Sequence, residues 1–193
     1  MIRHMAIQAQ DLHSIINSNQ EIEKWVRIAK SANVRLLTIL LPSGDVLEKM
    51  LEVLSKKTYF IEENIKCSVI GNWFDLSETC IAAIKRITHL TSGCTSMQVT
   101  FAVNYDAKEE LVRATQEIAI RTKHSKIKPE DITQTIIKTH LPTESLMYVT
   151  HHIISGSEST HGFLLWDAMD AKIMFVKQAY LITAYIQDLL KNQ

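Results

Sequence analysis

The sequence lacks a net charge and a long apolar run, and each absence excludes a class of protein. Its 21 Lys and Arg residues equal its 21 Asp and Glu residues in number, so no overall field attracts nucleic acid or an anionic membrane. The longest apolar run, residues 36–41, is far too short to cross a bilayer, and the amino terminus lacks the pattern of a secretory signal. We expect a protein with no transmembrane segment and no nucleic-acid partner, in the cytoplasm or peripheral to a membrane.

Paired cysteines are also missing. Cys67, Cys80 and Cys94 are odd in number and lack the two-residue spacing of zinc or redox pairs. We therefore expect three reduced, buried thiols.

The sequence has few combinations of residues that could hold a metal. His151, His152, Glu158 and His161 lie close together in the sequence, but neighbouring histidines on an extended segment point to opposite faces. No pair of them has the four-residue spacing that brings two ligands together on a helix. We predict a polar loop here and no metal site.

What the sequence does contain is alternation of strand-like and helix-like segments. With 193 residues and 46% hydrophobic content, the chain suffices for one sizeable core, and we expect a single domain over residues 1–193. Strand character is found in residues 4–7, 35–41, 66–70 and 97–103. Between them lie three helical stripes: Ile22, Trp25, Val26 and Ala29; Val46, Met50, Val53 and Leu54; Cys80, Ala83, Ile84 and Ile87. This alternation predicts an α/β fold, with a mostly parallel central sheet flanked by helices.

The second half of the chain is less regular. Residues 120–128 are basic and polar without periodicity, so Lys123, Lys126 and Lys128 are expected in a solvated loop. A helix is predicted from residue 129 through 140, where Pro142 ends it. Residues 146–149 and 173–176 read as further strands, and a closing helix has Ile182 and Ile186 on its apolar face.

The most informative stretch is residues 99–114, where a period of two changes abruptly to a helical period. A strand therefore runs directly into a helix, and Asn104, Tyr105 and Asp106 form the corner between them. In open α/β sheets, ligands bind where the carboxyl ends of strands meet the amino ends of helices. The topology alone predicts a site at this corner.

The corner resembles the Asn-Tyr-Gly-Gly-Arg element of the cis-prenyltransferases, the family of undecaprenyl and dehydrodolichyl diphosphate synthases. Asn104 and Tyr105 match, whereas Asp106, Ala107 and Lys108 stand in place of Gly-Gly-Arg. The resemblance continues in three further segments, in the expected order: Val69-Ile70-Gly71-Asn72, His140-Leu141-Pro142 and Gly162-Phe163-Leu164-Leu165-Trp166.

The resemblance implies an enzyme that condenses isopentenyl diphosphate with an allylic diphosphate, using Mg²⁺ and cationic groups to hold two polyanions. In the family an Asp-Gly-Asn-Gly-Arg loop follows the first strand, and an Arg-x-Ser-Gly-Glu segment precedes the final strands. Here Gln10 stands in place of the aspartate, and Asp11-Leu12-His13-Ser14 replaces the rest of the loop. Asp11 is one residue out of register, and leucine and histidine lack the conformational freedom of glycine that lets backbone approach a phosphate.

Two more charged positions of the family are altered. Residues 146–150 are aligned with its Leu-Leu-Ile-Arg-Thr strand, which puts Val149 in place of an arginine and leaves residues 151–161 about four residues longer than the family's equivalent. Lys172 stands where a glutamate that helps to hold metal is common. After the second strand, Ser43 and Gly44 remain as backbone donors for an anion, or as a simple helix cap.

These comparisons define the candidate site. The candidate catalytic residues are Asp11, Asn104 and Asp106. The candidate diphosphate-binding residues are Gln10, Asp11, Ser43, Gly44, Asn104, Tyr105 and Lys108. No metal-ligand set is assigned, and Mg²⁺ is expected only if the protein is an active enzyme.

Three functions follow from this pattern. The leading hypothesis is a non-catalytic accessory subunit of a heteromeric prenyl diphosphate synthase, because residues 159–166 resemble the Ser-Thr-Leu-Gly-Phe-Leu-Pro-Trp segment of the Nogo-B receptor type of subunit. Its partner would be a motif-complete cis-prenyltransferase. The second is a repurposed prenyltransferase that acts on an allylic diphosphate with Asp11, Asn104, Asp106 and Lys108 recruited. The third is a homodimeric scaffold or binding protein that holds an apolar ligand. A prenyl diphosphate is a further possible ligand.

Overall fold

A six-stranded sheet organises the molecule, and all of its strand pairs are parallel. The computed structural model describes residues 2–14 and 18–191. The strands are β1 (His4–Ala9), β2 (Leu36–Leu40), β3 (Ile65–Ile70), β4 (Met97–Ala102), β5 (His151–Ser155) and β6 (Lys172–Val176). Their order across the sheet is β3-β4-β2-β1-β5-β6. The predicted α/β class and parallel sheet are therefore confirmed.

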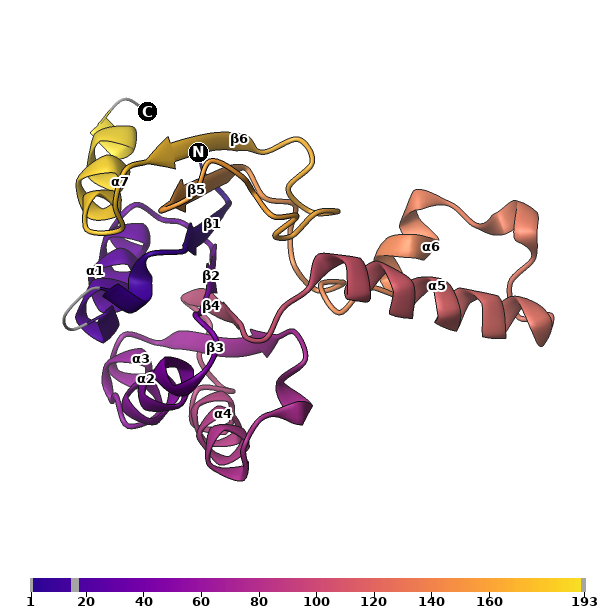
Figure 1. Ribbon diagram of the computed structural model, residues 1–193, viewed down its shortest axis with the longest axis horizontal. Coiled ribbons are helices and arrows are strands. Elements are labelled where there is room, and N and C mark those ends of the chain that lie inside the picture. Colours follow the sequence, from indigo (N-terminus) through magenta and orange to yellow (C-terminus); the bar gives the residue numbers. More distant parts are fainter. Residues whose placement is uncertain (1, 15–17, 192–193) are drawn as a thin grey trace.

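Helices supply the crossovers that parallel strands require. They are α1 (Ser18–Ser31), α2 (Asp45–Ser55), α3 (Tyr59–Glu62), α4 (Glu78–Leu90), α5 (Ala107–Lys123), α6 (Gln134–Thr139) and α7 (Leu181–Lys191). Helix α1 contacts both α7 and α2, and α2 contacts α4, so these four helices form one layer. Helices α5 and α6 lie on the opposite side, where they extend away from the sheet as an arm (Figure 1).

The two faces of the sheet differ in chemistry. Alternate residues of the strands, such as Ile7, Ile39 and Phe101, point into a large apolar core that includes Trp25 of α1. The other face carries a smaller apolar cluster in which Ala6 and Ala102 lie under Phe163, Leu164 and their neighbours from the chain between β5 and β6. On this second face several polar side chains are buried as well: His4, Gln8, Thr38, Thr100 and His152.

The topology places a switch point at β1. The chain proceeds from β1 to β2 on one side, and it returns much later to β5 on the other side. The connections that leave the neighbouring strands β1 and β5 run in opposite directions, and such a pair opens a crevice at the carboxyl ends, the usual ligand position in open α/β sheets. The end of β1, at residues 8–11, is therefore the centre of the expected site.

The prediction of a strand at residues 146–149 is wrong. Leu146 and Val149 are buried because they cover the second face of the sheet, and the N–H of Val149 donates to the carbonyl of Asp167 outside the sheet. The strand that pairs with β1 on the side away from β2 is β5, which lies within the segment that was expected to be a polar loop. When β5 instead of residues 146–150 is aligned with the family's Leu-Leu-Ile-Arg-Thr strand, the extra length of about four residues in segment 151–161 is no longer needed.

Smaller corrections concern the helices. The solvated loop expected over residues 120–128 begins later, because α5 continues to Lys123, although Lys126 and Lys128 are exposed as predicted. The helix predicted over residues 129–140 divides into a 3₁₀ turn, Pro129–Asp131, and α6, whose first turn is capped by the Thr133 hydroxyl. In α2, Val53 is 41% exposed, because the buried stripe runs through Leu47 and Leu51 instead.

The three cysteines are as the sequence predicts. All three cysteines are buried and free, and burial raises the pKa of the Cys67 thiol to about 12. None of the helices in the described ranges is long and apolar enough to span a bilayer.

Candidate functional site

Three adjoining cavities lie at the carboxyl ends of the strands. The corner cavity, about 210 Å³, is lined by Gly71, Asn72, Asn104, Tyr105, Glu110 and Arg113 among others. The central cavity, about 290 Å³, is lined by Gln8, Gln10, Leu40, Tyr105, Lys108 and Phe163 among others. The lateral cavity, about 300 Å³, is lined by Gln10, His13, Leu40 and Ser43 among others. Shared residues join them into one crevice.

The corner itself is built by close backbone contacts between β3 and β4. Gly71 has φ +97°, and a Cβ on it would stand 2.2 Å from the carbonyl oxygen of Val103, so only glycine fits there. Asn104 has φ 46°, a left-handed conformation that asparagine tolerates. Its backbone carbonyl accepts from the Asn72 N–H at 3.2 Å, and its Nδ2 donates to the Asn72 carbonyl at 3.2 Å. Asn104 therefore fixes the end of β4 against the end of β3.

Asp106 occupies the amino end of α5. Its Oδ1 accepts from the backbone N–H of Lys108 at 2.8 Å and from that of Glu109 at 3.3 Å. These are the donors that a helix amino end would otherwise offer to a phosphate. At this corner the Asp106 carboxylate therefore occupies the position that a bound phosphate would take.

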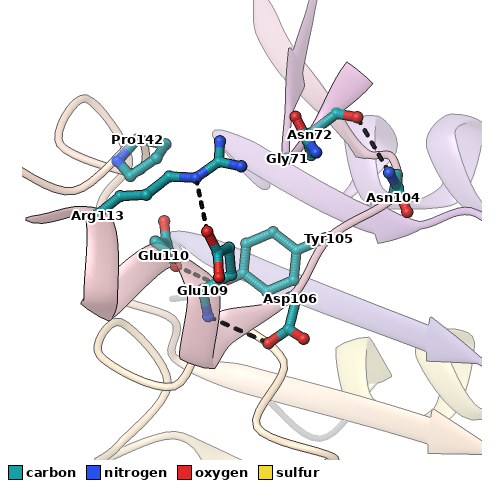
Figure 2. Close-up of a pocket in the computed structure, with 9 residues that line it drawn as sticks. All are labelled: Gly71, Asn72, Asn104, Tyr105, Asp106, Glu109, Glu110, Arg113 and Pro142. Carbon is teal, nitrogen blue, oxygen red and sulfur yellow. Dashed lines mark hydrogen bonds and ion pairs between the residues drawn. The ribbon is translucent and has the colours of Figure 1, made fainter. Parts of the chain in front are cut away.

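The remaining charges of the corner cavity are mostly acidic. Figure 2 shows the Asn72–Asn104 pair on one side of the cavity and Glu109, Glu110 and Arg113 on the other. The guanidinium of Arg113 is paired with Glu109, with Nε 3.1 Å from Oε1. The cavity therefore has three acidic side chains, including Asp106, and a single cation that is already paired.

Tyr105 and Glu110 are tied together below the cavity surface. The Tyr105 hydroxyl donates to Glu110 Oε2. Burial raises the pKa of both groups, and their mutual contact raises that of Tyr105 further. Nearby, Lys138 forms a buried ion pair with Asp167 and donates to the carbonyl of Thr143 at 2.5 Å. This polar cluster anchors α5 and α6 to the loop that covers the sheet.

Asp11, the leading carboxylate candidate, has both oxygens engaged by its own chain. Ser155 Oγ donates to Oδ1 at 2.6 Å, and the backbone N–H of Ala179 donates to Oδ2 at 2.8 Å. Gly156 packs so closely that a Cβ there would lie 2.9 Å from the Asp11 backbone nitrogen. In this position Asp11 joins the end of β1 to β5 and to the start of α7.

The other predicted residues divide among the cavities. Gln10, Tyr105 and Lys108 meet at the central cavity, while Asn104 and Asp106 line the corner cavity. Ser43 lines the lateral cavity and is exposed, and Gly44 precedes α2 with φ 76°. Asp11 and Gly44 are not among the residues that line these three cavities.

Several lining residues escaped the sequence analysis. Gln8 is fully buried in the middle of the sheet, and Glu110 and Phe163 face the crevice from α5 and from the covering loop. The alternation of side chains along a strand could have located Gln8, because it lies two residues before Gln10 and therefore points to the same face.

No cluster of metal ligands is preformed in the part of the chain that the structure describes. Over residues 2–14 and 18–191 there is no group of three or more His, Cys, Asp and Glu side chains placed to hold a metal ion. With β5 at His151–Ser155, the family's Arg-x-Ser-Gly-Glu pattern falls on residues 153–157 and matches at Ser155 and Gly156. Ile153 then stands in place of the arginine and Ser157 in place of the glutamate, so the substituted arginine position is Ile153 and not Val149, while the prediction for Lys172 is unaffected.

Comparisons with known proteins agree with this fold. A family model described as "Putative undecaprenyl diphosphate synthase" matches residues 17–182. The isoprenyl transferase of Zymomonas mobilis is 32% identical over 120 residues, which cover 60% of this chain and 47% of that protein. The isoprenyl transferase of Prochlorococcus marinus is 28% identical over 165 residues, covering 79% and 61% respectively.

A solved structure of similar length also matches. Lavandulyl diphosphate synthase from Lavandula x intermedia, crystallised with dimethylallyl diphosphate, superposes with a TM-score of 0.84 at 20% identity and covers 99% of this chain and 94% of that one. By contrast, the chain spans about half to three-fifths of the length of the curated relatives that it matches.

Proposed function

The chain belongs to the cis-prenyltransferase family, and from this premise we propose that it is a catalytically degenerate member, an accessory subunit of a heteromeric prenyl diphosphate synthase in isoprenoid biosynthesis. The observation that carries the proposal is the position of its own acids. Asp106 caps the helix end that would receive a phosphate, and Asp11 is engaged by Ser155 and Ala179.

The charge balance of the crevice supports the same proposal. A diphosphate needs cationic or N–H donors, whereas the corner cavity presents Asp106, Glu109 and Glu110 with Arg113 already paired. Lys108 is the lysine that lines the central cavity. Each charge-assisted hydrogen bond to a buried ion is worth about 1.5 to 3 kcal/mol. Loss of two such bonds weakens binding by roughly a hundredfold or more.

An accessory role also needs a surface for a partner. The edge strand β6 exposes Ile173 and Phe175, which are 42% and 54% accessible, and Met169 just before it is 71% accessible. Exposed apolar side chains beside an unpaired strand edge favour association. The partner in this proposal is a motif-complete cis-prenyltransferase, and a homodimer is the state expected in its absence.

The test is to purify the chain alone and with candidate partners. The proposal expects no elongation of farnesyl diphosphate with isopentenyl diphosphate and Mg²⁺ by the chain alone. It also expects co-purification with a motif-complete synthase from the same genome, and higher turnover by the complex than by the partner alone. Efficient elongation by the isolated chain would refute the accessory role.

A second candidate is a repurposed enzyme on an allylic diphosphate. Its support is the nearly end-to-end match to lavandulyl diphosphate synthase, combined with a crevice that remains open at Gln10, Tyr105 and Lys108. This alternative predicts turnover of dimethylallyl diphosphate by a homodimer, without isopentenyl diphosphate. It also predicts that Lys108→Ala abolishes that turnover.

A further inference from the structure

We propose that the central cavity binds a neutral apolar alcohol, whose hydroxyl donates to the side-chain carbonyl of Gln8. This inference goes beyond the accessory role and does not depend on it. It rests on one buried amide, on the charges around it and on the walls of the cavity.

Gln8 lies on β1, at the centre of the sheet, and its side chain is fully buried. Its Nε2 donates to the backbone carbonyl of Ser159 at 3.4 Å. Because a carbonyl can only accept, this bond assigns the other terminal atom as Oε1. Oε1 has no hydrogen-bond partner in the described structure, although Gln8 lines the cavity. A buried acceptor left without a donor is unfavourable, and a ligand hydroxyl at this end of the cavity would supply the missing donor.

The charges around the cavity select a neutral ligand. Lys108 and Asp106 are its two oppositely charged lining residues, and Asp106 already accepts two backbone N–H groups. The Nε2 of His161 lies 3.0 Å from the Ser157 hydroxyl. A diphosphate carries acceptors only at neutral pH, and its oxygens would face the free acceptor of Gln8. A hydroxyl presents the donor that Gln8 needs.

Part of the cavity wall is apolar and can cover a small hydrocarbon group. Leu40 lies at the end of β2, and Phe163 meets Tyr105 edge to face with ring centroids 5.4 Å apart. These side chains can cover hydrocarbon, and the rest of the lining, which includes Gln10 and Thr160, is mostly polar. A volume of about 290 Å³ suits a small ligand, such as a short terpene alcohol.

The experiment is a calorimetric titration of the full chain with three matched probes: geraniol, geranyl methyl ether and geranyl diphosphate. The ether keeps the hydrocarbon and loses the donor. We expect geraniol to bind roughly tenfold more tightly than the ether, which corresponds to one hydrogen bond of about 1.4 kcal/mol. We also expect it to bind more tightly than the diphosphate.

Two variants locate the contact. Gln8→Leu should weaken geraniol about tenfold and leave the affinity for the ether unchanged. Gln98→Leu is the matched control, because Gln98 lies on β4 near the opposite end of the sheet, where it donates to Ser68 and Thr100. This variant should bind geraniol like the unaltered protein.

The outcomes separate this inference from the accessory role. Absence of geraniol binding, equal affinity for alcohol and ether, or binding that survives Gln8→Leu would each overturn the alcohol site. Those results would leave the accessory role standing, as long as geranyl diphosphate binds no better. Tighter binding of the diphosphate would overturn both. If Gln8→Leu fails to fold, the comparison of alcohol with ether on the unaltered protein still decides.

Discussion

Mild acid should destabilise this protein, because two histidines are buried in their neutral form. His4 and His152 face the second side of the sheet and are fully inaccessible. Burial lowers the pKa of each from 6.5 to about 4. The Nδ1–H of His4 donates to the Met147 carbonyl at 2.6 Å, and its Nε2 lies 2.8 Å from the Thr38 hydroxyl. Neither ring nitrogen of His152 has a hydrogen-bond partner in the described structure.

The direction and size follow from linkage. Between pH 6.5 and pH 4 the unfolded chain binds protons that the folded chain excludes, so stability falls as the pH falls through this window. Relative to pH 7.5, each histidine should lower the free energy of unfolding at pH 5 by about 2 kcal/mol. Both together should account for about 4 kcal/mol.

Urea unfolding at pH 7.5 and pH 5 measures this loss, and His152→Leu isolates one histidine. In this variant the difference between the two pH values should shrink by about 2 kcal/mol. His124→Leu, at an exposed position, is the control and should change that difference by less than about 0.5 kcal/mol. Because carboxylates contribute equally to all three proteins, an unchanged pH dependence in His152→Leu would refute the reasoning.

Three other predictions concern the corner and its supports, and one concerns the thiols. Gly71→Ala should lower the free energy of unfolding by about 3 kcal/mol, because the residue has a positive φ and the added Cβ would collide with the backbone of Val103. The control Gly93→Ala, where a Cβ meets nothing, should lower it by less than about 0.5 kcal/mol. Equal losses would contradict the close contact described at the corner. Lys138→Met should cost about 3 kcal/mol by stranding the buried Asp167 carboxylate, and adding Asp167→Leu should recover much of it in the double variant. Asp106→Ala should lower the free energy of unfolding by about 1 kcal/mol, because it removes a helix cap. The freed N–H groups can then bind an anion, so pyrophosphate should raise the Tm of the variant and not that of the unaltered protein. A rise in the unaltered protein would show that its anion site is already free. All three cysteines should resist a thiol reagent until urea unfolds the chain, and rapid labelling of the folded protein would disprove their burial.

Much of the fold could be predicted from the sequence because the parallel sheet is strongly apolar on one face. The change of period within residues 99–114 identified β4 and α5, since their buried residues recur at the spacing of a strand and then of a helix. Strand β5 was missed because His152 and Ser155, two polar residues, are buried in it. Apolar residues 146–149 just before it have the more typical strand composition, yet they only cover the sheet.

The site was less predictable, because its contacts join residues that are far apart in the sequence. The corner could be located, since Asn104, Tyr105 and Asp106 follow a clear strand. Asp11 was expected at the crevice, but its partners Ser155 and Ala179 are 144 and 168 residues away. Gln8 lies just beyond the strand expected over residues 4–7, and its contact with the Ser159 carbonyl, 151 residues away, could not be read from the sequence.

The most direct test of the central claim is a calorimetric titration of the purified chain with farnesyl diphosphate, in the presence and absence of Mg²⁺. Asp106 and Asp11 are committed to the protein's own N–H and hydroxyl groups, so the account predicts weak binding that does not depend on the metal. Tight binding that requires Mg²⁺ and is lost in Asp11→Asn would show that the crevice still binds a diphosphate through the metal, and it would contradict the account.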